Sequence, residues 1–164
     1  MATELSLIDR ALNAIASVAM GLSSVLMVVL IVIFGWLVFG RYVLNDTPTW
    51  VEQLALLIVV WIAFLAAAVG IRRNSHLAVD FIRDAMPGPL RRACVLLSIA
   101  ALLFFGVVMA WQGYVMFERT AQREIPLLGV SEGWRAVPVA LSGAMIALFC
   151  LDELIKTLLA GDRS

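Results

Sequence analysis

The fold is decided by residues 11–40, which read ALNAIASVAMGLSSVLMVVLIVIFGWLVFG and contain no charged side chain. As an α-helix, this stretch would be about 45 Å long, which exceeds the roughly 30 Å hydrocarbon core of a bilayer. We therefore predict a membrane-spanning helix over 14–39, with the remainder tilted or outside the core. Ahead of it, apolar residues at helical spacing predict an amphipathic turn on the membrane surface: Leu5, Ile8, Leu12 and Ile15.

Three further apolar stretches predict spans over 50–71, 93–117 and 134–155. The last is the shortest, because only 136–151 is uncharged, and Pro138 near its start predicts a kink. The composition agrees with a membrane protein: 63% of residues are apolar and 15% are charged, whereas soluble domains have about 25% charged residues. We predict an all-α integral membrane protein whose residues 1–164 form a single four-helix transmembrane domain.

The distribution of lysine and arginine predicts the orientation. The N-terminus, the segment between the second and third spans, and the C-terminus together carry eight of these residues, and the opposite side carries four. Cytoplasmic segments are enriched in lysine and arginine. We therefore expect both termini in the cytoplasm. The net charge of zero gives no indication of nucleic-acid binding.

The segment between the second and third spans has its own apolar pattern. Val79, Ile82 and Met86 recur at helical spacing, and charged residues occupy the other face. Such a pattern predicts a short amphipathic helix on the cytoplasmic membrane surface. Pro87-Gly88-Pro89 would end it.

Glu52 is the acidic residue nearest to an apolar span. Together, Thr49 and Glu52 have the spacing of a capping box, in which both side chains bond to free backbone N–H groups at a helix start. Trp50 beside them fits the aromatic belt at the membrane surface. A proton- or cation-carrying role for Glu52 and a subunit contact are the alternatives.

Charged residues recur every fourth position just past the second span, at Arg72, His76 and Asp80. If the helix continues, they share one face and could form a charged ladder. The alternatives are a solvated loop, a partner contact, or a contact with lipid phosphates. Arginines that could meet lipid headgroups are Arg72, Arg73, Arg91 and Arg92. Asp152 and Glu153, after the fourth apolar stretch, are expected to be solvated, and Lys156 to extend to the membrane surface.

The spans lack the features of a self-sufficient carrier or enzyme. No charged residue lies deep within a span, and no span is broken at mid-depth by glycine or proline, whereas ion-coupled carriers generally need such features. Motifs for phosphate binding, metal binding or nucleophilic catalysis are missing, and one histidine cannot supply a bis-histidine haem site. We expect an accessory subunit that is not an enzyme and holds no cofactor. Gly106 and Ala110, four apart, suit close helix packing.

An ordered set of short motifs resembles the small membrane subunit (DctQ-like, or Q subunit) of tripartite ATP-independent periplasmic (TRAP) transporters. The motifs, spread over about residues 30 to 145, are Arg41-Tyr42-Val43, Pro48-x-Trp50-x-Glu52, Gly70, Arg72, His76-Leu77-x-Val79-Asp80, Gly129-Val130, Trp134 and Pro138-Val139.

The resemblance implies a role. Such systems combine a periplasmic substrate-binding protein, a small membrane subunit, and a large membrane subunit that holds the substrate and sodium sites. By this resemblance, the chain would be a scaffold in the bacterial inner membrane for the large subunit during sodium-coupled uptake of organic acids, in contact with membrane lipids. The alternatives are a small homo-oligomeric proton-coupled carrier that uses Glu52, or a membrane adaptor of another complex. Subunit-interface or structural candidates are Arg41, Trp50, Glu52, Arg72, His76, Asp80, Trp134 and Pro138.

Overall fold

The computed structural model describes the backbone of residues 2–45, 48–85, 88–126 and 128–161, and the side chains of 8–45, 48–73, 93–126 and 128–158. Four long helices dominate it. In chain order, the elements are α1 Ala2–Phe39, a π-helical turn η1 Gly40–Leu44, α2 Thr49–Ala85, α3 Gly88–Thr120, β1 Glu124–Ile125, β2 Val130–Ser131, a 3-10 turn η2 Glu132–Arg135, and α4 Val137–Gly161.

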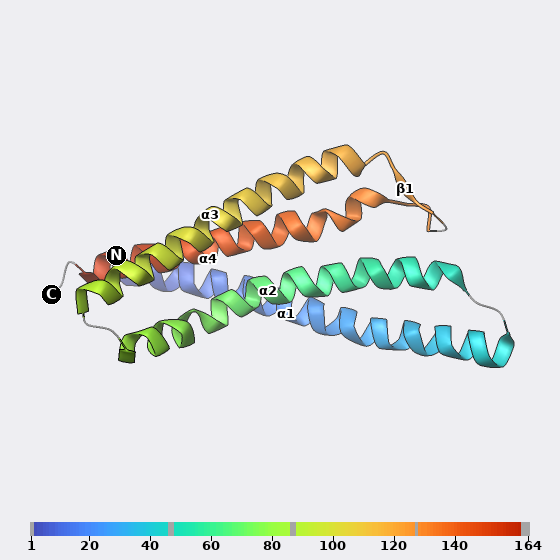
Figure 1. The fold of residues 1–164 in the computed structure, drawn as a ribbon, viewed down its shortest axis with the longest axis horizontal. Helices are drawn as coiled ribbons and strands as arrows, with labels where there is room; N and C mark the ends of the chain where they lie inside the picture. Colours follow the sequence, from blue (N-terminus) through green and yellow to red (C-terminus); the bar gives the residue numbers. More distant parts are fainter. Residues whose placement is uncertain (1, 46–47, 86–87, 127, 162–164) are drawn as a thin grey trace.

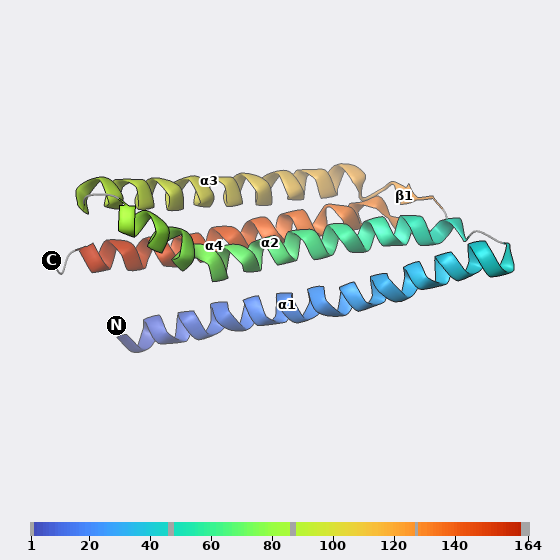
Figure 2. The same cartoon turned by 60° about the horizontal axis from the view of Figure 1, so that its bottom comes forward.

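The helices form two hairpins that lie side by side (Figure 1). α1 packs against α2 and α3 packs against α4, and the hairpins meet where α2 contacts α4. Figure 2 shows that the start of α1 and the end of α4 lie at one end of the bundle. We call this the charged end, because the cluster described below lies there, and we call the opposite end, with η1 and the two strands, the hairpin end.

Within the described residues, four helices are long and apolar enough to cross a membrane, over Ile8–Leu44, Thr49–Arg73, Ala93–Thr120 and Glu132–Leu158. The prediction of an all-α protein with four such helices is therefore confirmed. Much of the apolar surface faces outward: Val18 is 71% exposed and Phe104 is 72% exposed. Outward-facing side chains of this kind are suited to lipid or to another membrane subunit.

Two expected surface segments are parts of the long helices. The backbone of 79–85 continues α2 without a break up to Ala85, so the expected short amphipathic helix is not a separate element. Its side chains lie outside the described residues. At the N-terminus, α1 is continuous, and Leu12 is buried while Ile8 and Ile15 are exposed. Leu12 therefore packs within the bundle and is not part of a separate surface turn.

The expected kink at Pro138 is replaced by a helix start. Pro138 is the second residue of α4, where its missing N–H costs little. The chain changes direction before it, in η2, whose start is capped by the Ser131 hydroxyl accepting from the Gly133 N–H at 3.1 Å. Pro138 is fully buried. The proline therefore begins the fourth helix without bending it.

Glycines bring α3 and α4 into backbone contact. A Cβ atom at Gly143 would lie 2.4 Å from the backbone nitrogen of Ala110, and one at Gly113 would lie 2.5 Å from that of Ala140. Gly106 similarly faces the backbone of α4. Apolar burial does not drive helix association in lipid, where close packing of small residues takes its place. The Gly106 and Ala110 spacing thus correctly predicted a close helix contact.

Candidate functional site

Arg72, near the middle of α2, lies at the centre of a charge cluster at the charged end. Its Nη1 donates to Oδ2 of Asp152 on α4 at 2.7 Å, and its Nη2 donates to Oδ1 of Asp9 on α1 at 3.0 Å. Nε and Nη2 also donate to Oδ1 of Asn13, at 3.4 and 3.3 Å. One guanidinium therefore connects three helices, which a planar group with five donors can do.

Lys156 on α4 completes the cluster. Its Nζ donates to Oδ2 of Asp152 at 2.8 Å, and it also forms an ion pair with Asp9. Each carboxylate is thus shared by two cations. The four formal charges of Asp9, Arg72, Asp152 and Lys156, which we call the four-charge cluster, cancel to zero.

The cluster is half sheltered from solvent. The side chains of Asp152 and Arg72 are 5% and 13% exposed, and those of Asp9 and Lys156 are 37% and 34% exposed. The Arg72 guanidinium also lies over the Phe149 ring, 5.5 Å from its centroid. Removing one member of a buried network leaves an uncompensated charge and costs about 3–5 kcal/mol, and the exposure of Asp9 and Lys156 puts this cluster at the lower end of that range.

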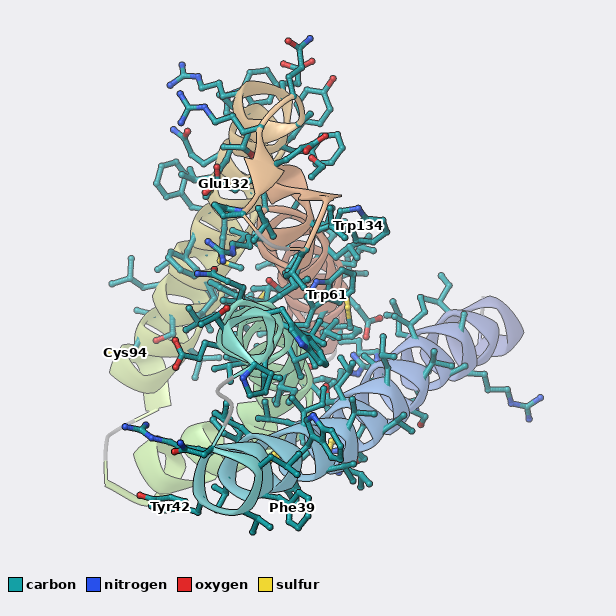
Figure 3. The ribbon with its side chains drawn as sticks, turned by 90° about the vertical axis from the view of Figure 1, so that its right-hand side faces the viewer. Phe39, Tyr42, Trp61, Cys94, Glu132 and Trp134 are labelled. Carbon is teal, nitrogen blue, oxygen red and sulfur yellow. The ribbon has the colours of Figure 1, made fainter. Side chains whose placement is uncertain are left out.

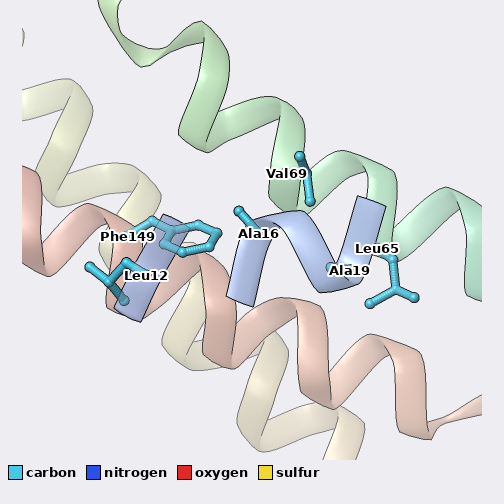
Figure 4. Close-up of a cluster of buried hydrophobic side chains, with 6 residues drawn as sticks. All are labelled: Leu12, Ala16, Ala19, Leu65, Val69 and Phe149. Carbon is cyan, nitrogen blue, oxygen red and sulfur yellow. The ribbon is translucent and has the colours of Figure 1, made fainter. Parts of the chain in front are cut away.

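An apolar cluster lies directly beside these charges and joins the same three helices. Figure 4 shows its members from α1, α2 and α4, which are Leu12, Ala16, Ala19, Leu65, Val69 and Phe149. The ring of Phe149 belongs to this cluster and also contacts Arg72. Packing and ion pairing therefore fix the charged end together.

A second polar contact between the hairpins lies nearer the hairpin end. Trp61 Nε1 on α2 donates to the carbonyl oxygen of Trp134 in η2 at 3.1 Å, and the two rings lie 6.3 Å apart (Figure 3). Arg135 Nη2 donates to Gln53 Oε1 at 2.8 Å. Together, these two hydrogen bonds hold the beginning of α4 in place against α2. The hydrogen bond uses the backbone carbonyl of Trp134, and the Trp134 ring adds an aromatic contact, so a structural role for this side chain stays a prediction.

Arg72, which the sequence singled out, pairs with Asp9 and Asp152 on two other helices, and the expected ladder with His76 and Asp80 stays a prediction. Asp152 was predicted to be solvated, and this is wrong: it is 6% exposed because Arg72 and Lys156 pair with it. Lys156 bonds to two carboxylates, so it does not simply extend to the surface. The side chains of His76, Asp80, Arg91 and Arg92 lie outside the described residues.

The order of the spans in the chain carries a signal that would have predicted the partners of Arg72. In a four-span chain, the beginning of the first span and the ends of the second and fourth come to the same side. Asp9, Arg72 and Asp152 occupy those three places. Sorting the charged residues by their sign and by the side of the membrane on which they lie would have predicted that these three side chains meet.

The other predicted residues lie apart from the four-charge cluster. Arg41 is exposed in η1, and Trp50 and Glu52 are exposed in the first turn of α2. Thr49 is already the first residue of α2, whereas a capping residue lies just before the helix, and the two cap bonds stay a prediction. Arg73 is exposed next to Arg72, where a lipid contact also stays a prediction.

The arrangement offers stabilising contacts and no chemistry of its own. Among the described side chains, no group of three His, Cys, Asp or Glu residues is placed to hold a metal ion. Cys94 and Cys150 are unpaired, and Cys150 is buried. Every carboxylate of the four-charge cluster is already bound by cations of the same chain.

Comparison with known proteins shows which family this chain resembles. Residues 30–160 match the family described as tripartite ATP-independent periplasmic transporters, DctQ component. The chain is 29% identical to the sialic acid TRAP transporter small permease protein SiaQ of Vibrio cholerae over 93% of this chain and 87% of that protein. It is 20% identical to a putative TRAP transporter small permease protein of Haemophilus influenzae, over 92% of this chain and 89% of that protein.

A longer relative is also similar. The chain is 30% identical to the sialic acid TRAP transporter permease protein SiaT of Haemophilus influenzae, over 66% of this chain and 18% of that protein. The motif-based resemblance is thus confirmed by a match that covers most of the sequence. This non-enzymatic chain belongs to the DctQ family of small TRAP transporter permease subunits.

Proposed function

We propose that the chain anchors a large permease subunit in the bacterial inner membrane, as a fixed scaffold against which that subunit moves. One observation carries the proposal. In the SiaT relative, the region like this chain makes up 18% of a longer permease polypeptide. The small region and the rest of the permease therefore work in a fixed one-to-one ratio there, which suits a permanent contact.

The exposed surface is large enough for such a contact. The chain exposes 10770 Å², whereas a compact soluble protein of 17.9 kDa would expose about 8,000 Å². The excess of about 2,800 Å² is enough for one side of a permanent interface, because each partner contributes about half of its total of roughly 2,000–5,000 Å². Outward-facing apolar residues on α1 and α3 supply this excess exposed surface. Lipid would cover the remainder.

The rigidity of the chain suits a scaffold. The four-charge cluster and the Trp61–Trp134 contact join the two hairpins at two levels, and the α3–α4 glycine contact holds one hairpin closed. A scaffold must keep its shape while its partner moves, and these contacts oppose shape change. Exposed residues near the hairpin end, such as Arg41, Trp50 and Glu52, are our candidates for subunit contacts.

The remaining parts of the proposal come from the family. The charged end would lie in the cytoplasm, in keeping with the excess of lysine and arginine on that side. Relatives are named for sialic acid and C4-dicarboxylates. These names support an organic acid as the cargo, and the family resemblance implies sodium coupling and delivery by a periplasmic binding protein, which we also propose.

Co-purification tests the anchoring role. The chain, tagged, is co-expressed with the large permease of its system and purified in a mild detergent. We expect a stable one-to-one complex by light scattering and mass spectrometry. A chain that purifies alone, without the large permease and with unchanged stability, would refute the anchoring role.

A further inference from the structure

A groove lies between α2, α3 and α4 at the charged end. It exists because α3 is held mainly by α4 and makes few contacts with α2. Its walls are apolar and are formed by Ile71, Ile99, Leu102, Phe149 and Cys150. Arg72 and Glu153 supply the charged groups that line it. An apolar groove with ionic groups has the character of an amphiphile site.

The charges at the groove favour a cation. Arg72 is already matched by Asp9 and Asp152, and with Lys156 the four-charge cluster is neutral. Glu153 is only partly exposed, and its carboxylate has no ion-pair partner among the described side chains. Among the described side chains that line the groove, the unmatched charge is therefore negative. In a partly desolvated site, an ammonium group would stabilise that carboxylate.

We propose that this groove binds one phospholipid with a primary-amine headgroup. Its ammonium group donates hydrogen bonds to Glu153, and one acyl chain lies along Leu102, which is 39% exposed, whereas Ile99 and Phe149 form the buried floor of the groove. A quaternary ammonium headgroup carries charge but no N–H donor, and a glycerol headgroup carries no cation. The expected order of binding is phosphatidylethanolamine first, phosphatidylcholine second and phosphatidylglycerol last. This site requires only that the chain spans a bilayer, so it is independent of the anchoring role.

Native mass spectrometry of the full-length chain tests the order. The delipidated chain in mild detergent is mixed with equal amounts of the three lipids. We expect phosphatidylethanolamine to be retained about three- to five-fold more than phosphatidylglycerol, the effect of one partly exposed ion pair. Equal retention of the three lipids would overturn the proposal, because it would indicate only adventitious lipid around the helices.

Two substitutions locate the site. Glu153→Gln should remove the preference for phosphatidylethanolamine while leaving lipid bound. Leu102→Trp should fill the groove and abolish the preferred lipid adduct. Leu97→Trp is the matched control, because Leu97 lies on the same helix, is 72% exposed and is not part of the groove. Equal lipid retention by the two tryptophan variants would overturn the proposal.

Discussion

The charged end and the α3–α4 contact hold helices together by opposite means. At the charged end, Arg72 joins three helices through long side chains and full charges. Between α3 and α4, Gly113 and Gly143 remove side chains so that backbones touch. The first contact depends on charge balance and the second on steric fit. Both replace the water-driven burial that is weak within a bilayer.

The largest effect is expected when the charge balance is broken. Arg72→Met leaves Asp9 and Asp152 with Lys156 as their one remaining cation in the cluster. Breaking a buried ionic network costs about 3–5 kcal/mol, and this network is partly exposed, so we expect a loss of stability at the lower end, about 3 kcal/mol. Thermal unfolding followed by helical circular dichroism measures this loss.

A double variant separates charge balance from packing. Arg72→Met with Asp152→Asn restores neutrality and should recover at least about half of the loss, because no carboxylate is then left unmatched. If the double variant is as unstable as Arg72→Met, the cluster acts through packing of the Arg72 side chain and the charge account is wrong.

The next largest loss of stability is expected when a methyl group is added to the α3–α4 contact. Gly143→Ala would place its Cβ 2.4 Å from the Ala110 nitrogen, so the helices must separate. Overpacking of this kind costs about 1–3 kcal/mol. Gly21→Ala is the control, since nothing lies within 4 Å of a Cβ there. Equal unfolding temperatures for the two variants would contradict the steric account.

A smaller effect is expected at the second contact between the hairpins. Trp61→Phe keeps an aromatic ring but removes the N–H that donates to the Trp134 carbonyl. The loss of one hydrogen bond should cost about 0.5–1.5 kcal/mol. Chemical unfolding of the variant beside the wild type gives the difference. A variant with unchanged stability would show that the indole N–H contributes nothing to this contact.

The smallest effect is expected at Glu52, which belongs to neither region. It is exposed at the start of α2, so Glu52→Gln should change stability by less than about 0.5 kcal/mol. Uptake by the assembled transporter should also be retained. Abolished uptake in a fully assembled complex would instead support the carrier hypothesis for Glu52.

The sequence predicted the helices well because hydrophobic length is a local property. Residues 11–40 alone require a long apolar helix, and Gly106 with Ala110 indicated a close contact. The partners of Arg72 were missed because Asp9 and Asp152 are far from it in sequence. Each charge, taken alone, resembles an ordinary residue at the membrane surface. The short strand pair was also missed, because two-residue strands carry no periodicity.

Uptake by purified components tests the central claim, that the chain anchors a transporter without providing its pathway. The chain and its large permease are placed in liposomes together and separately, with the periplasmic binding protein, its organic acid and a sodium gradient. We predict uptake with both membrane subunits, and none with this chain alone. Uptake by this chain alone, or full uptake by the large permease without it, would contradict the account.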